Sequence, residues 1–336
     1  MKILLIGGTG TISTAVTRRL ISQGQELYLL NRGIRKDSPE GAREIICDIH
    51  NEKDASQKLN GMTFDAVADF IAYSQEDLER DYRLFAGTTK QFIFISSASA
   101  YQKPPTDYII TESTPLSNPF WEYSRKKAAG ERYLMEKYTA EGFPITIVRP
   151  SHTYDERKVP VAVHGAKGSW QVIKRMLEGK PVIIPGDGTS LWTLTHNSDF
   201  AAGFTGLIGN PKALGQAVQI MTDERLTWNQ IYETIAGAAG TELHAVHISS
   251  DFLAAAGKQY DFSGELLGDK AHTVVFDISK LRRMVPDFAP KITMVQGLRT
   301  TVQYVLTHTD CQHSDPEFDT WCDKIIDIRK KALAAL

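Results

Sequence analysis

The sequence predicts an α/β protein with a doubly wound parallel sheet of the Rossmann type, and three observations support this fold class. Short apolar runs without polar alternation recur in the first half of the chain, as in strands that are buried on both faces. Segments with helical spacing of apolar residues lie between these runs. A glycine-rich turn, Gly7–Gly10, joins the first run to the first helical segment.

In the first half, strands and helices follow one another as a parallel sheet requires. We expect strands at Ile3–Ile6, Glu26–Leu30, Glu44–Cys47, Ala66–Phe70, Phe92–Ile95 and Ile145–Val148. We expect helices at Ile12–Ser22, Gln75–Phe85 and Glu122–Thr139.

The second half is less regular, and we expect it to form a smaller α/β lobe. Helices are predicted at Trp170–Leu177, Asp199–Ile208, Ile292–Leu306 and 315–335, and a further one from the N-cap Thr227 to Ala239. Strands are predicted at Val182–Ile184, Val218–Ile220, His244–Ile248 and Thr273–Phe276. Residues 1–165 are therefore predicted to be a dinucleotide-binding domain and residues 166–336 a substrate-binding lobe, with some interleaving of the two.

Composition excludes several classes of function. The chain has 336 residues, 42% of them hydrophobic, and a formal net charge of −2, so it can bury a large core and has no basic surplus for nucleic acid. No stretch approaches the roughly 20 apolar residues that span a bilayer. The three cysteines and nine histidines show no disulfide or metal-type spacing, so we expect a cytoplasmic protein without a metal site.

The glycine turn is predicted to hold the phosphates of a dinucleotide. Such a turn needs residues that tolerate positive φ, and pyrophosphate needs backbone N–H groups at a helix N-terminus. The expected contacts are Gly7, Thr9, Gly10, Thr11 and Ile12. Ser13 stands where the usual pattern has a third glycine, which predicts slightly looser packing of the helix on the strand. The alternative is an ordinary turn between a strand and a helix.

The next strands indicate which dinucleotide binds. The second strand ends in Asn31-Arg32 rather than in the acidic residue that accepts from the ribose 2′-hydroxyl in NAD sites. Arg32, with Arg35 and Lys36, is suited to a 2′-phosphate, which favours NADP over NAD; a solvated basic loop is the alternative. Further cofactor contacts are expected at the ends of the third and fourth strands, from Asp48, Ile49 and Phe70.

A tyrosine and a lysine on one helix are the candidate catalytic pair. Tyr123 and Lys127 are four residues apart and share a helix face. We expect the ammonium to lower the pKa of the phenol, so that Tyr123 transfers a proton while Lys127 also holds the nicotinamide ribose. Ser97 and Ser99 follow a buried strand, and either hydroxyl can bond the reacting oxygen. A surface Tyr–Lys pair is the alternative.

Taken together, these motifs resemble the extended and atypical short-chain dehydrogenases/reductases, the group of NAD-dependent epimerases and dehydratases that act on sugars. The resemblance covers residues 1 to about 300 and rests on the glycine turn, on the serine run ending in Tyr101, on Tyr123/Lys127 and on the segment 149–154. It implies that Ser97 is the active-site hydroxyl, with Ser99 as the fallback. It also implies that Pro150 and Ser151 lie near the nicotinamide and that the chain forms a homodimer.

The chain departs from this group at two places that bear on the reaction. No Asp-Glu pair follows Ser97, so 4,6-dehydration is not expected. The arginine that pairs with a substrate diphosphate is missing after Gly186–Gly188, where Trp192 stands, and His152 replaces a usual asparagine. A less charged, sugar-like substrate that contacts His152 and Trp192 is one interpretation. The other is that Trp192 belongs to the core and that Lys167 or Lys174 replaces the arginine.

The sequence thus predicts an NAD(P)-dependent epimerase or oxidoreductase acting on a hydroxyl or carbonyl of a sugar-like substrate. The alternative is a non-catalytic NADP-binding or RNA-binding protein, because some atypical members of the group that share the glycine turn have such roles. Tyr123 and Lys127 favour the enzyme.

Overall fold

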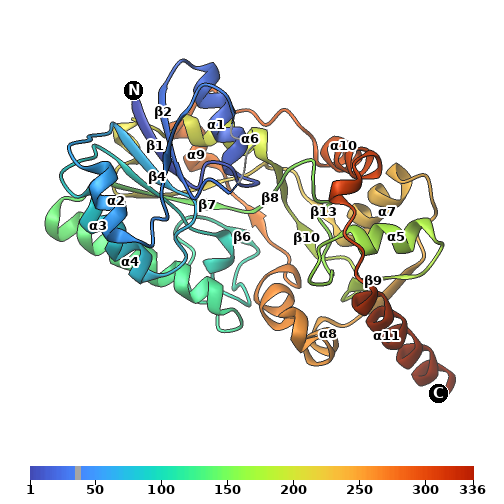
Figure 1. The fold of residues 1–336 in the computed structure, drawn as a ribbon. Helices are drawn as coiled ribbons and strands as arrows, with labels where there is room; N and C mark the ends of the chain where they lie inside the picture. Colours follow the sequence, from blue (N-terminus) through green and yellow to red (C-terminus); the bar gives the residue numbers. More distant parts are fainter. Residues whose placement is uncertain (35–38) are drawn as a thin grey trace.

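A seven-stranded parallel sheet organises the first part of the molecule, for which we use a computed structural model that describes residues 1–34 and 39–336 (Figure 1). The strand order is β12-β7-β5-β4-β1-β2-β3, and every pairing is parallel. The strands are β1 (Lys2–Ile6), β2 (Glu26–Asn31), β3 (Arg43–Ile46), β4 (Ala66–Asp69), β5 (Phe92–Ile95), β7 (Ile145–Pro150) and β12 (Gln216–Ile220). The predicted doubly wound fold is confirmed.

The strand order reverses between β1 and β4, and ligands bind outside the carboxyl ends of the strands at such a point. Every residue of β4, β5 and β7 is buried, which explains why these strands appear in the sequence as unbroken apolar runs. Asp69 ends β4 and is also buried, so a charged group lies directly beneath the ligand edge.

Helices cover both faces of this sheet (Figure 1). One face carries α1 (Ser13–Ser22), α6 (Asn197–Thr205) and α9 (Ser279–Met284), and the other carries α2 (Glu52–Leu59), α3 (Gln75–Phe85) and α4 (Glu122–Glu141). A capping box formed by Ser74 and Asp77 begins α3, and Gly142 ends α4 at a φ of 69°. The sequence pattern missed α2 because only Ala55 and Leu59 of that helix are buried.

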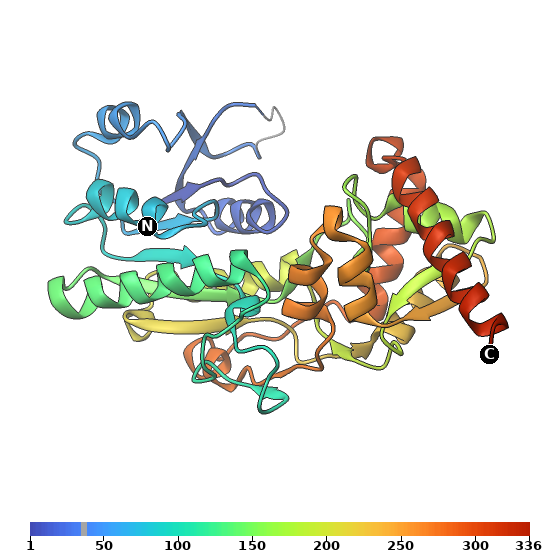
Figure 2. The same ribbon diagram turned by 90° about the horizontal axis from the view of Figure 1, so that it is seen from below.

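Helices packed around short strands form the second part, which lies beside the sheet (Figure 2). These helices are α5 (Trp170–Leu177), α7 (Trp228–Ala238), α10 (Met294–Thr307) and α11 (Pro316–Ala334). The strand pairs are β9 (Val182–Pro185) with β14 (Ala245–Ile248), β10 (Leu191–Trp192) with β13 (Leu226–Thr227), β8 (His152–Tyr154) with β11 (Leu194–His196), and β6 (Ile109–Ile110) with β15 (Val275–Phe276). A short helix, α8 (Ser250–Ala256), and a π-helix, Ser263–Lys270, complete this part.

The chain passes between the two parts more than once. Strand β12 and helices α6 and α9 follow residue 165 in the sequence, yet they belong to the sheet part. We had expected the strand at Val218–Ile220 in the lobe, whereas it pairs with β7 at the sheet edge. In the described part of the chain, none of the helices is long and apolar enough to cross a membrane.

Candidate active site

The glycine turn between β1 and α1 is closed by side chains of α1. Gly7 has a φ of 81°, and a Cβ atom there would lie 2.4 Å from Ile71 Cγ2, so only glycine fits. Ser13 Oγ accepts from the Gly10 N–H at 2.9 Å and donates to the Gly7 carbonyl at 2.6 Å. The serine in the third glycine position therefore fastens the turn to the helix.

The N-terminus of α1 is available to an anion. Its N-cap residue, Ile12, makes no capping hydrogen bond with its side chain, and its first turn has no acidic residue. The Thr14 N–H donates to the Gly10 carbonyl at 3.0 Å, and the first N–H groups of a helix have no carbonyl partner in the preceding turn. This positive helix end beside a tight turn fits the pyrophosphate of a dinucleotide.

A cavity of about 460 Å³ extends from the turn along the ends of β2 and β3. Its walls include many of the predicted cofactor contacts, namely Gly7, Thr9, Gly10, Asn31, Arg32, Asp48 and Ile49. Arg32 is exposed at this end, whereas Arg35 and Lys36 lie outside the described residues. Asn31 Oδ1 accepts from the Gly33 N–H at 2.9 Å, which shapes the loop that presents Arg32.

Five predicted cofactor residues do not line this cavity: Lys127 and Pro150, which lie toward the other end of the site, and Thr11, Ile12 and Phe70. Phe70 packs against Phe204, with ring centroids 5.4 Å apart, and Ile71 lines the cavity in its place. The Thr11 carbonyl accepts from Asn197 Nδ2 at 2.9 Å, which ties the turn to α6, and Ile12 packs against the core. Thr11, Ile12 and Phe70 support the turn from behind.

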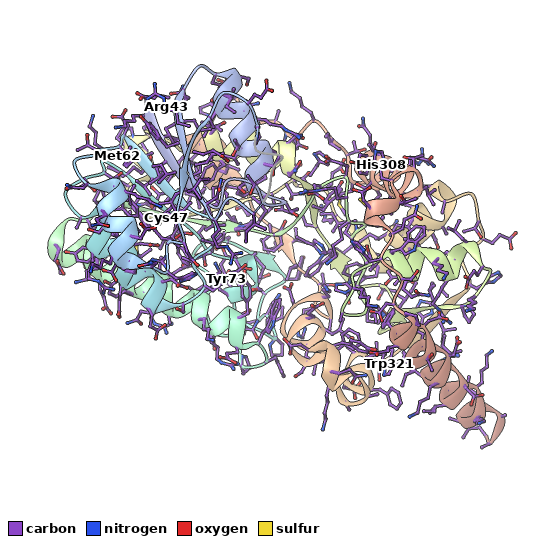
Figure 3. All side chains as sticks on the ribbon, in the orientation of Figure 1. Arg43, Cys47, Met62, Tyr73, His308 and Trp321 are labelled. Atoms are coloured by element: carbon purple, nitrogen blue, oxygen red, sulfur yellow. The ribbon has the colours of Figure 1, made fainter. Side chains whose placement is uncertain are left out.

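A second cavity of about 400 Å³ lies at the carboxyl ends of β5 and β7. It brings together the predicted residues Ser97, Ser99, Tyr123, Pro150, Ser151, His152 and Trp192. Tyr73, which follows β4, lines both cavities, so the two meet at its ring. In Figure 3, Tyr73 lies between Cys47, which lines the first cavity, and the second part of the molecule.

A chain of hydroxyl groups runs along the wall of the second cavity. Ser124 Oγ donates to Ser99 Oγ at 2.8 Å, and Ser99 Oγ lies 2.9 Å from Ser97 Oγ. Ser97 also lies near Tyr123, where it acts to lower the pKa of the phenol. Ser97 is half-buried and Ser99 is buried, so Ser97 is the more accessible of the two hydroxyls.

The electrostatics of the Tyr–Lys pair differ from the expectation. Burial raises the pKa of Tyr123 to about 12, against the lowering effect of Ser97. Lys127 Nζ donates to the carbonyls of Ala72 and Ile95, both at 2.7 Å, and lies 5.6 Å from the centre of the Tyr123 ring. The predicted lowering of the phenol pKa is therefore wrong for this structure, because the ammonium is held by backbone rather than directed at the phenol.

Lys127 is itself buried behind the cavities, and this burial lowers its pKa to about 8. The buried carboxyl group of Asp69 opposes that shift. The ammonium is thus present at neutral pH and lies below the place where the two cavities meet, since it is 4.9 Å from the centre of the Tyr73 ring.

Trp192 and His152 form a fixed part of the wall. Trp192 is 4% exposed, stacks on Trp228 with ring centroids 5.5 Å apart, and donates from Nε1 to His152 Nδ1 at 3.3 Å. Burial lowers the pKa of His152, which keeps this imidazole neutral. Trp192 is therefore mainly a core residue with one edge at the cavity. Lys174 pairs with Glu178 at the end of α5, and Lys167 lines a different cavity, so neither lysine lines the second cavity.

The sequence pattern missed several residues of the second cavity. Trp121, His164, Glu265, Asp269 and Lys270 all line it. The last three belong to a π-helix, whose spacing of five residues per hydrogen bond does not produce the usual helical pattern. Tyr73 follows a predicted strand, and its place at the ligand edge was the available signal.

The chain was compared with protein families and with known proteins. Residues 3–220 match the NAD dependent epimerase/dehydratase family. The chain is 26% identical over 290 residues to 2'-dehydrokanamycin reductase of Streptomyces kanamyceticus, covering 86% of this chain and 80% of that protein. It is 24% identical over 312 residues to the chloroplast stem-loop binding protein of 41 kDa b of Arabidopsis thaliana, covering 88% and 77% respectively.

Solved structures show the same architecture. UDP-glucuronic acid 4-epimerase from Bacillus cereus in complex with NAD superposes with a TM-score of 0.69 at 20% identity, over 91% of this chain and 99% of that one. The family match covers more than half of the chain and shows that the chain belongs to the NAD dependent epimerase/dehydratase family.

Proposed function

We propose that this protein transfers hydride between NADP(H) and a hydroxyl or carbonyl carbon of a sugar-like substrate, with Tyr123 as the acid and base. The observation that carries this proposal is that the hydrogen-bonded hydroxyls of Ser124, Ser99 and Ser97 lead to the cavity that Tyr123 also lines, and that Tyr73 lines both this cavity and the glycine-turn cavity. A nicotinamide bound across that meeting point would accept or donate the hydride.

The residues of the cavity have separate roles in this proposal. Ser97 donates a hydrogen bond to the substrate oxygen, and Tyr123 transfers the proton to or from that oxygen. Lys127 holds the ribose hydroxyls through its ammonium. The raised pKa keeps the Tyr123 phenol protonated at neutral pH, so the resting site is prepared to donate a proton, as reduction of a carbonyl requires.

Reduction is therefore the direction that we favour, in agreement with the named activity of the Streptomyces relative. Epimerisation is the competing reaction. Whether the purified protein retains its dinucleotide distinguishes epimerisation from reduction. A reductase must exchange its cofactor at each turnover, so the purified protein should release it on dialysis. Dinucleotide that stays bound through dialysis and gel filtration would favour epimerisation.

The proposed cofactor preference rests on Arg32. Its guanidinium lines the adenosine end of the first cavity, where a planar fork pairs well with a phosphate. Binding titrations with NADP and NAD should show NADP preferred by about tenfold or more, or about 1.4 kcal/mol. Arg32→Ala should remove that preference, whereas the control Arg18→Ala on α1 should keep it. A wild-type preference for NAD would refute the role of Arg32.

The central test is Tyr123→Phe, assayed by NADPH consumption with a panel of keto-glycosides. Removal of the acid should lower kcat by about 10²–10⁴-fold while NADPH binding is kept. Tyr108→Phe, at an exposed position, is the matched control and should retain full activity. If every activity of the protein survives Tyr123→Phe, the enzymatic proposal is wrong.

A second function is favoured by one observation, the likeness to the chloroplast stem-loop binding protein. The net charge of −2 argues against it, because phosphate backbones are bound by a surplus of lysine and arginine. Gel-shift titration with stem-loop RNA is expected to show no binding in physiological salt, and tight binding would favour the non-catalytic alternative.

A further inference from the structure

The π-helix Ser263–Lys270 forms the wall of the second cavity that carries its charged side chains. Glu265, Asp269 and Lys270 all line the cavity, as do Ser97 and Tyr123. The wide spacing of a π-helix brings residues five apart together, and Lys270 Nζ lies 2.7 Å from Glu265 Oε2. Two carboxyl groups and one ammonium therefore share the cavity with the catalytic hydroxyls.

This wall is fixed relative to the serine loop. Asn118 Nδ2 donates to the Gly268 carbonyl at 2.7 Å and to the Ser99 carbonyl at 2.8 Å. Gly264 lies against the Trp121 ring, where a Cβ atom would be 2.1 Å from Cδ1. The π-helix is thus seated on the residue that precedes α4, and its carboxyl groups keep a set position beside Tyr123.

Asp269 lies near a buried lysine, Lys103, but does not form a short hydrogen bond with it. The side chain of Lys103 is 2% exposed, and its Nζ lies 3.9 Å from Asp269 Oδ1, beyond the length of a charged hydrogen bond. In the part of the chain that the structure describes, the ammonium has no closer side-chain partner. A buried charge is costly without a partner, so this pair leaves hydrogen-bonding capacity for a ligand.

The lysine that lines the cavity is already paired with a carboxylate, and the two histidines that line it are neutral. Lys270 bonds Glu265 and the Ala162 carbonyl, and it is the single lysine or arginine among the described residues that line the cavity. Burial lowers the pKa of His164 to about 4 and also lowers that of His152, so both rings are neutral. Among the described residues that line the cavity, a substrate diphosphate would therefore find no unpaired lysine or arginine, whereas carboxylate oxygens remain as acceptors.

We propose that Asp269 and Glu265 are the substrate-recognition residues and that they select an uncharged, hydroxyl-rich substrate over a nucleotide diphosphate sugar. Asp269 accepts a hydrogen bond from a substrate hydroxyl. Burial raises the pKa of this carboxyl group to about 6, against the lowering effect of Lys103, so the group is mainly ionised at neutral pH. The aromatic rings of Trp121 and Tyr123 border the same space and provide the apolar faces that sugar rings contact. This inference rests on the proposed function, because it assigns the substrate class of the same site.

The test measures ligand binding to the full chain saturated with NADP, by saturation-transfer NMR. The probes are methyl α-D-glucoside, as an uncharged sugar, and UDP-glucose, as a diphosphate sugar. We expect the uncharged probe to bind in the wild type and UDP-glucose to bind at least tenfold more weakly. Asp269→Asn should weaken the uncharged probe about tenfold, whereas Asp251→Asn, at an exposed position in α8, should change nothing.

UDP-glucose binding as tightly as the uncharged sugar would overturn the proposal, and so would failure of both probes to bind to the wild type. Unchanged binding in a folded Asp269→Asn variant does so as well. If that variant fails to fold because Lys103 is left unpaired, the double variant Lys103→Met/Asp269→Asn removes both charges and should show the same tenfold loss. Failure of the proposed function would instead appear as loss of NADP binding or as turnover that does not depend on Tyr123.

Discussion

The two ends of the active site are built in different ways. The dinucleotide end consists of short stretches at or after the ends of β1, β2, β3 and β4, with the glycine turn among them. The substrate end consists of residues from the loop after β5 and from α4, β7, β10 and the π-helix, which come from both halves of the chain. The comparison teaches that the chemistry common to the family lies in local motifs, whereas selectivity depends on long-range assembly.

The largest effect is expected at the dinucleotide end, from Gly7→Val. A side chain at Gly7 requires a strained φ of 81° and overlaps Ile71, so we expect loss of about 1–3 kcal/mol of stability and of NADP binding by about 100-fold or more. Titration of the purified variant with NADP measures this. Gly24→Val is the matched control, because Gly24 has a φ of 68° but no atom within 4 Å of its Cβ position. Normal NADP affinity in Gly7→Val would show that the backbone of the glycine turn does not bind the dinucleotide.

A smaller effect is expected at the substrate end, from Asn118→Ala. The change leaves the buried carbonyls of Ser99 and Gly268 without a donor, which should cost about 1–3 kcal/mol in the free energy of unfolding. Turnover should fall about tenfold while NADP affinity is kept, because the variant loosens only the substrate wall. Denaturant unfolding and NADP titration check both parts, with the exposed Asn60→Ala as the control. If Asn118→Ala lowered NADP affinity as much as turnover, the dinucleotide end and the substrate end would not be separately built.

The smallest effect is a pH dependence of NADP binding. Burial lowers the pKa of Lys127 to about 8, so the ammonium is present below that pH and is lost as the pH rises through it. NADP affinity should therefore fall by up to about tenfold between pH 7 and 9.5, which corresponds to about 1.4 kcal/mol. Lys127→Met should bind weakly with a flat profile, whereas the exposed Lys126→Met should follow the wild type. A flat wild-type profile would mean that Lys127 does not hold the cofactor.

The fold and the dinucleotide end could be predicted from the sequence because their signals are local. The glycine turn, Arg32 and Asp48 each follow an apolar strand within a few residues, and parallel strands bring those positions to one edge. Tyr123 and Ser97 could be predicted for the same reason, because Tyr123 lies in the first turn of α4 and Ser97 follows β5 within two residues.

The remaining features depend on contacts that no local pattern encodes. The pKa of Tyr123 was predicted with the wrong sign because the position of Lys127 is set by two carbonyls, of Ala72 and Ile95, at the ends of other elements. Asp269 faces the cavity because a π-helix is seated on Trp121, and neither the helix type nor the contact has a sequence motif.

Tyr73 has a consequence for how the two ligands influence each other. Its ring lines both cavities and lies 6.0 Å from the Tyr123 ring, so ligands in the two cavities contact the same side chain. If bound NADP changes the position of this ring, the affinity for substrate changes as well. The change in the free energy of substrate binding is the coupling free energy between the two sites. Thermodynamic linkage then requires reciprocity: the factor by which NADP tightens substrate binding equals the factor by which substrate tightens NADP binding.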